Sequence, residues 1–146
     1  SLRRDVRFGG LVRNVHYWSA NLLVVITFLH LLRTFFTGAF HGPRQFNWVI
    51  GVLLLLVVLA SNFTGYLLPW DQLSFWAITI GANMATFAPL FNTPSQLLLL
   101  GGIEVGQNTL LRFYVLHVIL MPLVAAVFLA VHFWRIRKDG GISGPL

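Results

Sequence analysis

Three long apolar runs, separated by polar and turn-forming residues, dominate the pattern of the chain. They extend over about residues 11–36, 46–68 and 109–134, and none of them contains an acidic residue. Each is long enough to supply the roughly 20 residues that an α-helix needs to cross the hydrocarbon core of a bilayer. The pattern therefore predicts an all-α membrane protein, built as a bundle of three transmembrane helices.

The stretch between the second and third runs, about residues 69–108, has a different pattern. Its apolar runs are short and are interrupted by turn formers such as Gly81, Pro89 and Pro94. We expect short helices at the membrane interface there rather than a fourth span. Because three consecutive spans alternate in direction, the first and third helices should run parallel, and we expect a single domain over residues 1–146.

Composition narrows the chemistry that such a bundle can perform. The chain is 57% hydrophobic and 10% charged, has four acidic residues and lacks cysteine. The absence of cysteine excludes disulfide scaffolds, cysteine-ligated metals and iron–sulfur clusters. Four acidic residues are too few to make catalysis by paired carboxylates a good candidate. The net charge of +6 comes from Lys and Arg at the ends of the apolar runs. Basic residues at these positions anchor helices at the surface of a lipid bilayer. They do not form the continuous basic surface that binds a nucleic acid.

Four histidines inside the spans are the candidate metal ligands. His16 and His30 lie 14 residues apart in the first span, and His117 and His132 lie 15 apart in the third. At about 100° per residue, each pair returns close to one helix face. In parallel helices His16 then faces His117, and His30 faces His132. Two such clamps suit two six-coordinate haems, and without cysteine both would be non-covalent.

Glycines and arginines at matching positions support two haems. Gly51 and Gly65 are 14 residues apart in the second span, where a missing side chain lets a flat group approach the backbone. Arg13 and Arg33 lie one turn outside His16 and His30, where haem propionates need cations. Each feature also has a plainer interpretation. A single intramembrane histidine is often a packing residue, small residues permit close helix contact, and interfacial arginines serve as anchors.

The motifs are more specific than these patterns. They are RNVHYWSA and HLLR in the first span, FTGYLLPWDQLSFWA from Phe63, TLLRFYVLH from Thr109, HFWRIRK from His132, and GISGPL at the end. With these motifs the chain resembles the amino-terminal part of the cytochrome b family, b6 type, over essentially its whole length. The 15-residue spacing between His117 and His132 and the sequence GISGPL are similar to the split b6 form, in which the remaining helices belong to a separate subunit.

The resemblance implies a haem b-bearing core subunit of a quinol:cytochrome c or quinol:plastocyanin oxidoreductase, which carries electrons across the membrane and is not an enzyme alone. It also implies that His16 and His117 hold the low-potential haem iron, and that His30 and His132 hold the high-potential one. Arg13 and Arg33 would meet the propionates of these two haems respectively. No residue of this chain is expected to be catalytic by itself.

The resemblance also implies quinone sites and partners. The quinol-oxidation pocket would be lined by Phe63, Leu73, Ala77, Ile78 and Ile80, with Arg137 near the quinone-reducing side. Partners would be a Rieske iron–sulfur protein, a c-type cytochrome and a second membrane subunit that supplies the missing helices and the Pro-Glu-Trp-Tyr motif, in a dimeric complex. The family helix that precedes the one bearing His16 is absent from this sequence, so we expect part of the haem enclosure to come from elsewhere.

Location and rival functions complete the sequence-based expectations. The loop GAFHGPRQFNW differs from the plant form and favours a bacterial plasma membrane over a thylakoid. One rival function is a dihaem membrane anchor that exchanges electrons between a dehydrogenase and quinone, a class that lacks the PWDQ segment. The other is a transporter or assembly scaffold, whose histidines bind a metal ion or nothing and whose purified form would be colourless.

Overall fold

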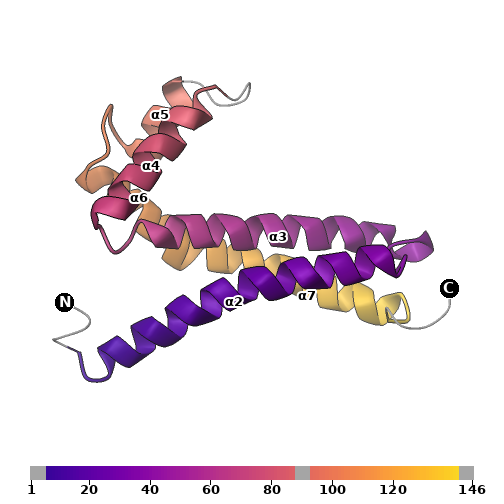
Figure 1. Cartoon of the computed structure of the whole chain (residues 1–146). Coiled ribbons are helices and arrows are strands. Elements are labelled where there is room, and N and C mark those ends of the chain that lie inside the picture. Colours follow the sequence, from indigo (N-terminus) through magenta and orange to yellow (C-terminus); the bar gives the residue numbers. More distant parts are fainter. Residues whose placement is uncertain (1–5, 88–92, 142–146) are drawn as a thin grey trace. The chain divides into compact units, whose positions relative to one another are not determined.

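Every regular element in the part of the chain that the structure describes is a helix (Figure 1). The structure is a computed structural model, and it describes residues 6–87 and 93–141. The elements are α2 (Gly9–Phe36), the 3-10 turn η1 (Gly42–Arg44), α3 (Gln45–Tyr66), α4 (Gln72–Ala85), α5 (Thr93–Leu100), α6 (Gln107–Val115), the π turn η2 (Leu116–Leu120) and α7 (Met121–Lys138). The predicted all-α class is confirmed.

Three of the continuous helical stretches are long and apolar enough to cross a membrane. They extend over Gly9–Phe36, Gly42–Tyr66 and Gln107–Lys138. In the first and third, none of the most apolar 18 residues is buried within the chain, and in the second only 17% are. Large apolar side chains that point outward in this way fit contact with lipid or with other membrane helices. The three predicted spans are confirmed, with ends that differ by a few residues.

The described residues divide into two compact units. The first unit comprises α2, η1, α3 up to Leu59 and α7 from Ala125. The second unit comprises the end of α3 from Ala60, the short helices α4 to α6, the π turn and the beginning of α7. Each unit is described below by itself.

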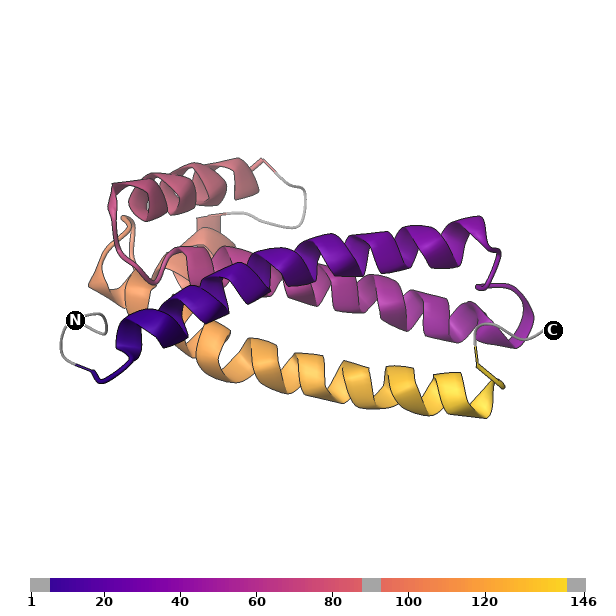
Figure 2. The ribbon, with the colours of Figure 1, turned by 60° about the horizontal axis from the view of Figure 1, so that its bottom comes forward.

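In the first unit, aromatic rings hold the end of α2 against the beginning of α3. Phe35 stacks on Phe40 with ring centroids 5.8 Å apart, and Phe40 lies 5.2 Å from Trp48. Phe35 and Trp48 are themselves 6.3 Å apart, so the three rings form one cluster. Figure 2 shows the tight turn between the two helices that this cluster closes. The turn fixes which residues of α2 and α3 face each other.

Several polar side chains of α2 form hydrogen bonds with the backbone of the same helix. An asparagine and three threonines each donate a hydrogen bond to the backbone carbonyl four residues earlier, at 2.7–3.0 Å. In the membrane-spanning part of a helix, where water is absent, such bonds replace the partners that water would provide. The residues are Asn21, Thr27 and Thr34 within α2 and Thr37, which caps its carboxyl end.

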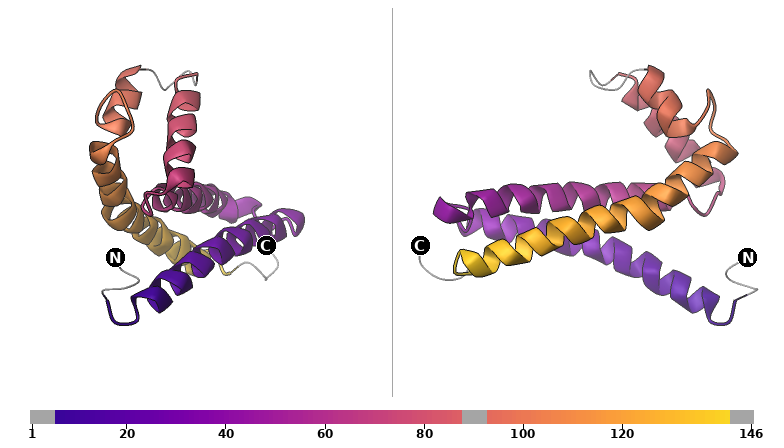
Figure 3. Two further views of the ribbon diagram at one scale, coloured as in Figure 1. Left: turned by 60° about the vertical axis from the view of Figure 1, so that its left-hand side comes forward. Right: turned by 180° about the vertical axis from the view of Figure 1, so that it is seen from behind.

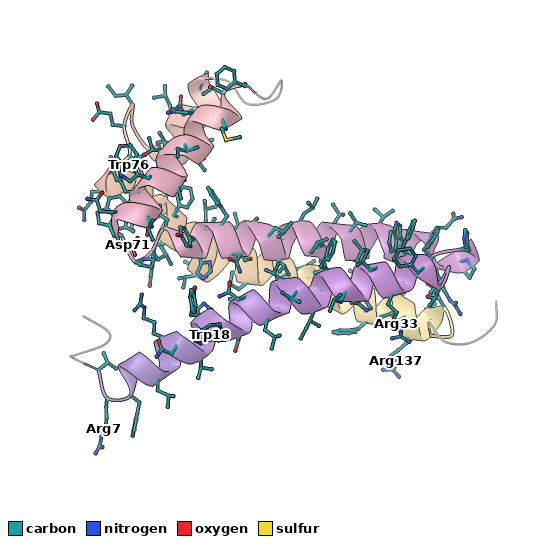
Figure 4. All side chains as sticks on the ribbon, viewed as in Figure 1. Arg7, Trp18, Arg33, Asp71, Trp76 and Arg137 are labelled. Carbon is teal, nitrogen blue, oxygen red and sulfur yellow. The ribbon has the colours of Figure 1, made fainter. Side chains whose placement is uncertain are left out.

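In the second unit, the short helices α4, α5 and α6 pack around a small apolar core (Figure 3). Its members are 1–2% exposed and come from all three short helices and from the residue that follows α3: Leu67, Ile78, Ala82, Leu100 and Phe113. Asp71 begins α4 by accepting hydrogen bonds from the backbone N–H of Ser74 at 2.9 Å and from its hydroxyl at 2.5 Å. Figure 4 marks Asp71 at the start of this helix, with Trp76 further along it. The short helices expected between the second and third spans are thus present.

Thr109 is the most deeply buried polar residue of the second unit, and we expect its loss to destabilise the α5–α6 connection. Its side chain is fully buried, donates to the carbonyl of Leu100 at 2.7 Å and accepts from the N–H of Gly106 at 3.1 Å. Thr109→Val keeps the shape but leaves both partners unpaired, which costs about 1–3 kcal/mol. Thermal unfolding in detergent should show the loss, whereas Thr79→Val on α4, which breaks only an exposed intrahelical bond, should change little.

Candidate haem sites

His30 on α2 and His132 on α7 face each other in the first unit. Their ring centroids are 6.4 Å apart and their planes are nearly perpendicular, at 84°. A metal–imidazole bond is about 2 Å long, so two imidazoles that share one metal ion have centroids about 6 Å apart. The predicted pairing of His30 with His132 therefore has the separation that a single iron atom between the rings requires.

A pocket lies beside this pair and reaches the η1 turn. Besides the two histidines it is lined by polar and small residues, among them Thr34, Arg44, Asn47, Gly51 and Asp139. Arg44 and Asn47 are buried, each only 7% exposed. A cationic and an amide side chain held inside an otherwise apolar unit are suited to an anionic group of a cofactor. These residues therefore fit a haem: the two imidazoles would hold its iron, and Arg44 would neutralise a propionate.

Gly51 approaches the same histidine from α3. A Cβ atom at this position would lie 3.5 Å from Cε1 of His132, which is ordinary van der Waals contact. The glycine therefore lies beside His132 in the lining of the pocket, and its role in clearance for a haem remains a prediction. The contact leaves room for one methyl group, and a longer side chain would enter the space beside the imidazole.

In the second unit, α3 holds His117 in a defined orientation. Nδ1 of His117 donates a hydrogen bond to the carbonyl of Ser61 at 2.9 Å, and the Thr64 hydroxyl lies 3.3 Å from the same nitrogen. A hydrogen bond from one ring nitrogen fixes the tautomer and leaves the other, Nε2, for a metal. Ser61 and Thr64 were not predicted as site residues, because a hydrogen bond from a histidine to a backbone carbonyl on another helix leaves no sequence signature.

Gly65 on α3 lies directly beside His117. A Cβ atom here would lie 2.6 Å from Cε1 and 3.0 Å from Nδ1 of the imidazole. Such a distance is shorter than any real contact, so no other residue fits without displacing the ring. The structure thus places Gly65 against the imidazole itself. Clearance for the haem ring remains a prediction at this position.

His16 and Arg13 lie on α2 in the first unit, whereas His117 lies in the second. Both α2 residues are exposed. The pairing of His16 with His117, and the role of Arg13 at a propionate, remain predictions.

The arginines at the other end of the first unit differ in their surroundings. Arg33 in the last turn of α2 and Arg137 near the end of α7 are exposed, and Figure 4 shows them at the same end of this unit. Arg135 is engaged within the protein: it donates to the carbonyl of Pro43 at 3.0 Å and pairs with Asp139 at 3.2 Å. Among these cations only Arg44 lines the pocket of His30 and His132. From its position after the first apolar run, Arg44 is indistinguishable from an arginine that anchors a helix at the membrane surface.

The residues predicted to line the quinol-oxidation pocket have unequal surroundings. Leu73 and Ile80 on α4 are 69% and 56% exposed, and Phe63 on α3 is 44% exposed. Ala77 is half-buried, and Ile78 is fully buried in the apolar core of the second unit. Leu73 and Ile80 are therefore open to an additional surface, whereas Ile78 already has its packing partners. The quinone role of this set remains a prediction.

Comparison with known proteins gives one consistent answer. The family model described as cytochrome b/b6/petB matches residues 1–140. Cytochrome b6 of Heliomicrobium gestii is 48% identical over 145 residues, which are 99% of this chain and 68% of that protein. Cytochrome b6 of Mesostigma viride is 47% identical over 142 residues, or 97% of this chain and 66% of that protein. The match to a b/b6 model favours the quinol oxidoreductase over a dehydrogenase anchor or a scaffold.

A solved structure is similar as well. A chain of a hyperthermophilic respiratory complex III matches 99% of this chain with a TM-score of 0.83 and 30% identity, and the match covers 39% of that chain. Together with three membrane-length helices, these likenesses identify an integral membrane protein of a multi-subunit complex. The chain belongs to the cytochrome b family, b6 type, whose members are the haem b-bearing core subunits of quinol oxidoreductase complexes of the bc and b6f kinds.

Proposed function

We propose that this chain holds two non-covalent haem b groups and carries electrons across the membrane between them during quinol oxidation and quinone reduction. The facing pair His30 and His132, with ring centroids 6.4 Å apart, carries the proposal. His30 and His132 hold the high-potential haem iron, and His16 and His117 hold the low-potential one. Haem b supplies reversible one-electron chemistry at each site.

The residues around the ligands hold and orient these groups. The hydrogen bond to the Ser61 carbonyl places the proton of His117 on Nδ1, so Nε2 would be the nitrogen that binds the haem iron. Gly51 and Gly65 leave space beside the two imidazoles of the third span. At the His30 and His132 site, buried Arg44 meets a propionate together with Arg33 at the water-facing edge, and Arg13 serves the other haem.

The proposal includes further subunits of the complex. A Rieske iron–sulfur protein and a c-type cytochrome would accept one electron from each quinol, and the two haems held by this chain would provide the route for the other. A second membrane subunit brings further helices and the Pro-Glu-Trp-Tyr motif, and the complex is dimeric. Quinol binds near Phe63 and α4, and Arg137 lies at the quinone-reducing side. The divergent loop from Gly38 to Trp48 supports a bacterial plasma membrane as the location.

The test is a count of the cofactor. We expect the purified complex to contain two haems b for each copy of this chain, and acid acetone to extract both, because no cysteine is present to form a thioether bond. Pyridine haemochrome spectra before and after extraction measure both quantities. One haem or none per chain, or haem that stays with this polypeptide in acid acetone, would contradict the proposal.

A further inference from the structure

The third span contains one turn that is not α-helical, and it includes His117. Residues Leu116–Leu120 form a π turn, which the N–H of Met121 closes by donating to the carbonyl of Leu116, five residues earlier. A π turn holds one residue more than the α-helical turn that it replaces. Such turns are rare and unfavourable in isolation, so this one calls for a local cause and a compensating role.

Pro122 supplies the local cause. It is the second residue of α7 and follows the π turn directly. Proline has no N–H to donate to the carbonyl four residues earlier, that of Val118, and its ring clashes with that carbonyl in a regular α-helix. Widening the preceding turn by one residue moves that carbonyl away from the ring. The sequence Leu-His-Val-Ile-Leu-Met-Pro thus favours a π turn at this place.

The extra residue agrees with the spacing of the ligands. His16 and His30 are 14 residues apart on α2, and Gly51 and Gly65 are 14 apart on α3, whereas His117 and His132 are 15 apart. Both α2 and α3 are regular α-helices throughout. The spacing between the histidines of the third span therefore exceeds the spacing in the other two spans by one residue. The π turn in the third span accommodates one residue of this kind.

We propose that the π turn at Leu116–Leu120, set by Pro122, is the positioning element that absorbs this additional residue and keeps the imidazole of His117 on the Ser61 carbonyl and beside Gly65. The inference rests on the proposed function, because it concerns how His117 is held as an iron ligand. The contacts that it explains are specific: Nδ1 lies 2.9 Å from the Ser61 oxygen, and the space at Gly65 admits no side chain. A helix of the same sequence without the π turn would rotate His117 by about 100° out of this position.

The experiment removes the additional residue of the π turn together with Pro122, which favours the turn. Deleting Ile119 and replacing Pro122→Ala leaves a regular α-helix with a 14-residue spacing, and the side chains of both residues are exposed, so no buried contact is lost. We expect this variant, in the whole complex, to keep two haems per chain and both midpoint potentials of the parent. Inserting an alanine after Val118 gives a spacing of 16, and we expect it to lose the redox component that depends on His117.

A matched deletion tests whether tolerance is specific to the π turn. Deleting Val24 shortens the His16–His30 spacing to 13 within α2, where no π turn exists to absorb the change, so we expect at least one haem to be lost. The inference is overturned if the Ile119 deletion with Pro122→Ala fails to assemble or loses the His117 component, or if the Val24 deletion keeps both haems. A parent complex that holds no haem would overturn the proposed function instead.

Discussion

Replacing His30 or His132 by leucine is expected to abolish the same redox component. The two rings face each other across the space of one iron atom, so either substitution removes half of the protein's axial ligands to that iron. Leucine is apolar and of similar size, which leaves the helix face suited to the bilayer. Spectroelectrochemical titration of each purified variant complex should show one of the two haem b components missing, the same one in both.

His117→Leu provides the matched comparison. It removes a ligand of the other proposed site, so the component that it deletes should be the one that His30→Leu and His132→Leu retain. If His30→Leu and His117→Leu removed the same component, the proposed pairing would be wrong, and with it the parallel order of the first and third spans.

Gly65→Ala is expected to cost most of the haem bound through His117, while Gly51→Ala leaves the haem content unchanged. The new methyl group at position 65 would lie 2.6 Å from Cε1 of His117, whereas at position 51 it would lie 3.5 Å from Cε1 of His132. To relieve the clash the His117 ring must leave the Ser61 carbonyl. Losing a partner that orients a metal ligand weakens metal binding by about 10–100-fold. Haem content of the purified variants, measured under partial loading, checks this.

The two glycine variants control for each other. Alanine favours a helix over glycine by about 1 kcal/mol, so neither substitution weakens α3 itself. Gly65→Leu should lose the same component more completely, because a larger side chain moves the ring further. Full haem content and unchanged spectra in Gly65→Ala would mean that the imidazole can shift freely, and that the glycine serves only helix packing.

The spans were predictable, and the histidines could be selected as candidate ligands, for a simple reason. An apolar run of membrane length has few alternatives to a helix, and ionisable residues inside such a run are costly enough to indicate function. The pairing of His30 with His132 follows from helix direction alone, and the structure brings these rings together. The interruption of residues 69–108 by turn formers likewise predicted short helices, of which α4 and α5 are examples.

Other features depend on contacts that a periodic pattern does not encode. The apolar run between His117 and His132 predicts a regular α-helix, because its composition would be the same whether it contained a π turn or not. Pro122 was the available signal. In sequence, Arg44 appeared equivalent to the other arginines at the ends of the apolar runs. Its position in the lining of the pocket depends on the η1 turn and on the contact between the rings of Phe35 and Trp48.

The internal hydrogen bonds of α2 bear on how the protein is made. Asn21, Thr27, Thr34 and Thr37 bring their own acceptors, since each bonds to a carbonyl of the same helix. A nascent segment of this kind can leave the translocation channel sideways into lipid without waiting for a neighbouring helix to satisfy those groups. For these four side chains, membrane insertion of the first span does not depend on the later helices. The proposed haem sites, which would take ligands from two helices, would then form only after the later spans have entered the membrane.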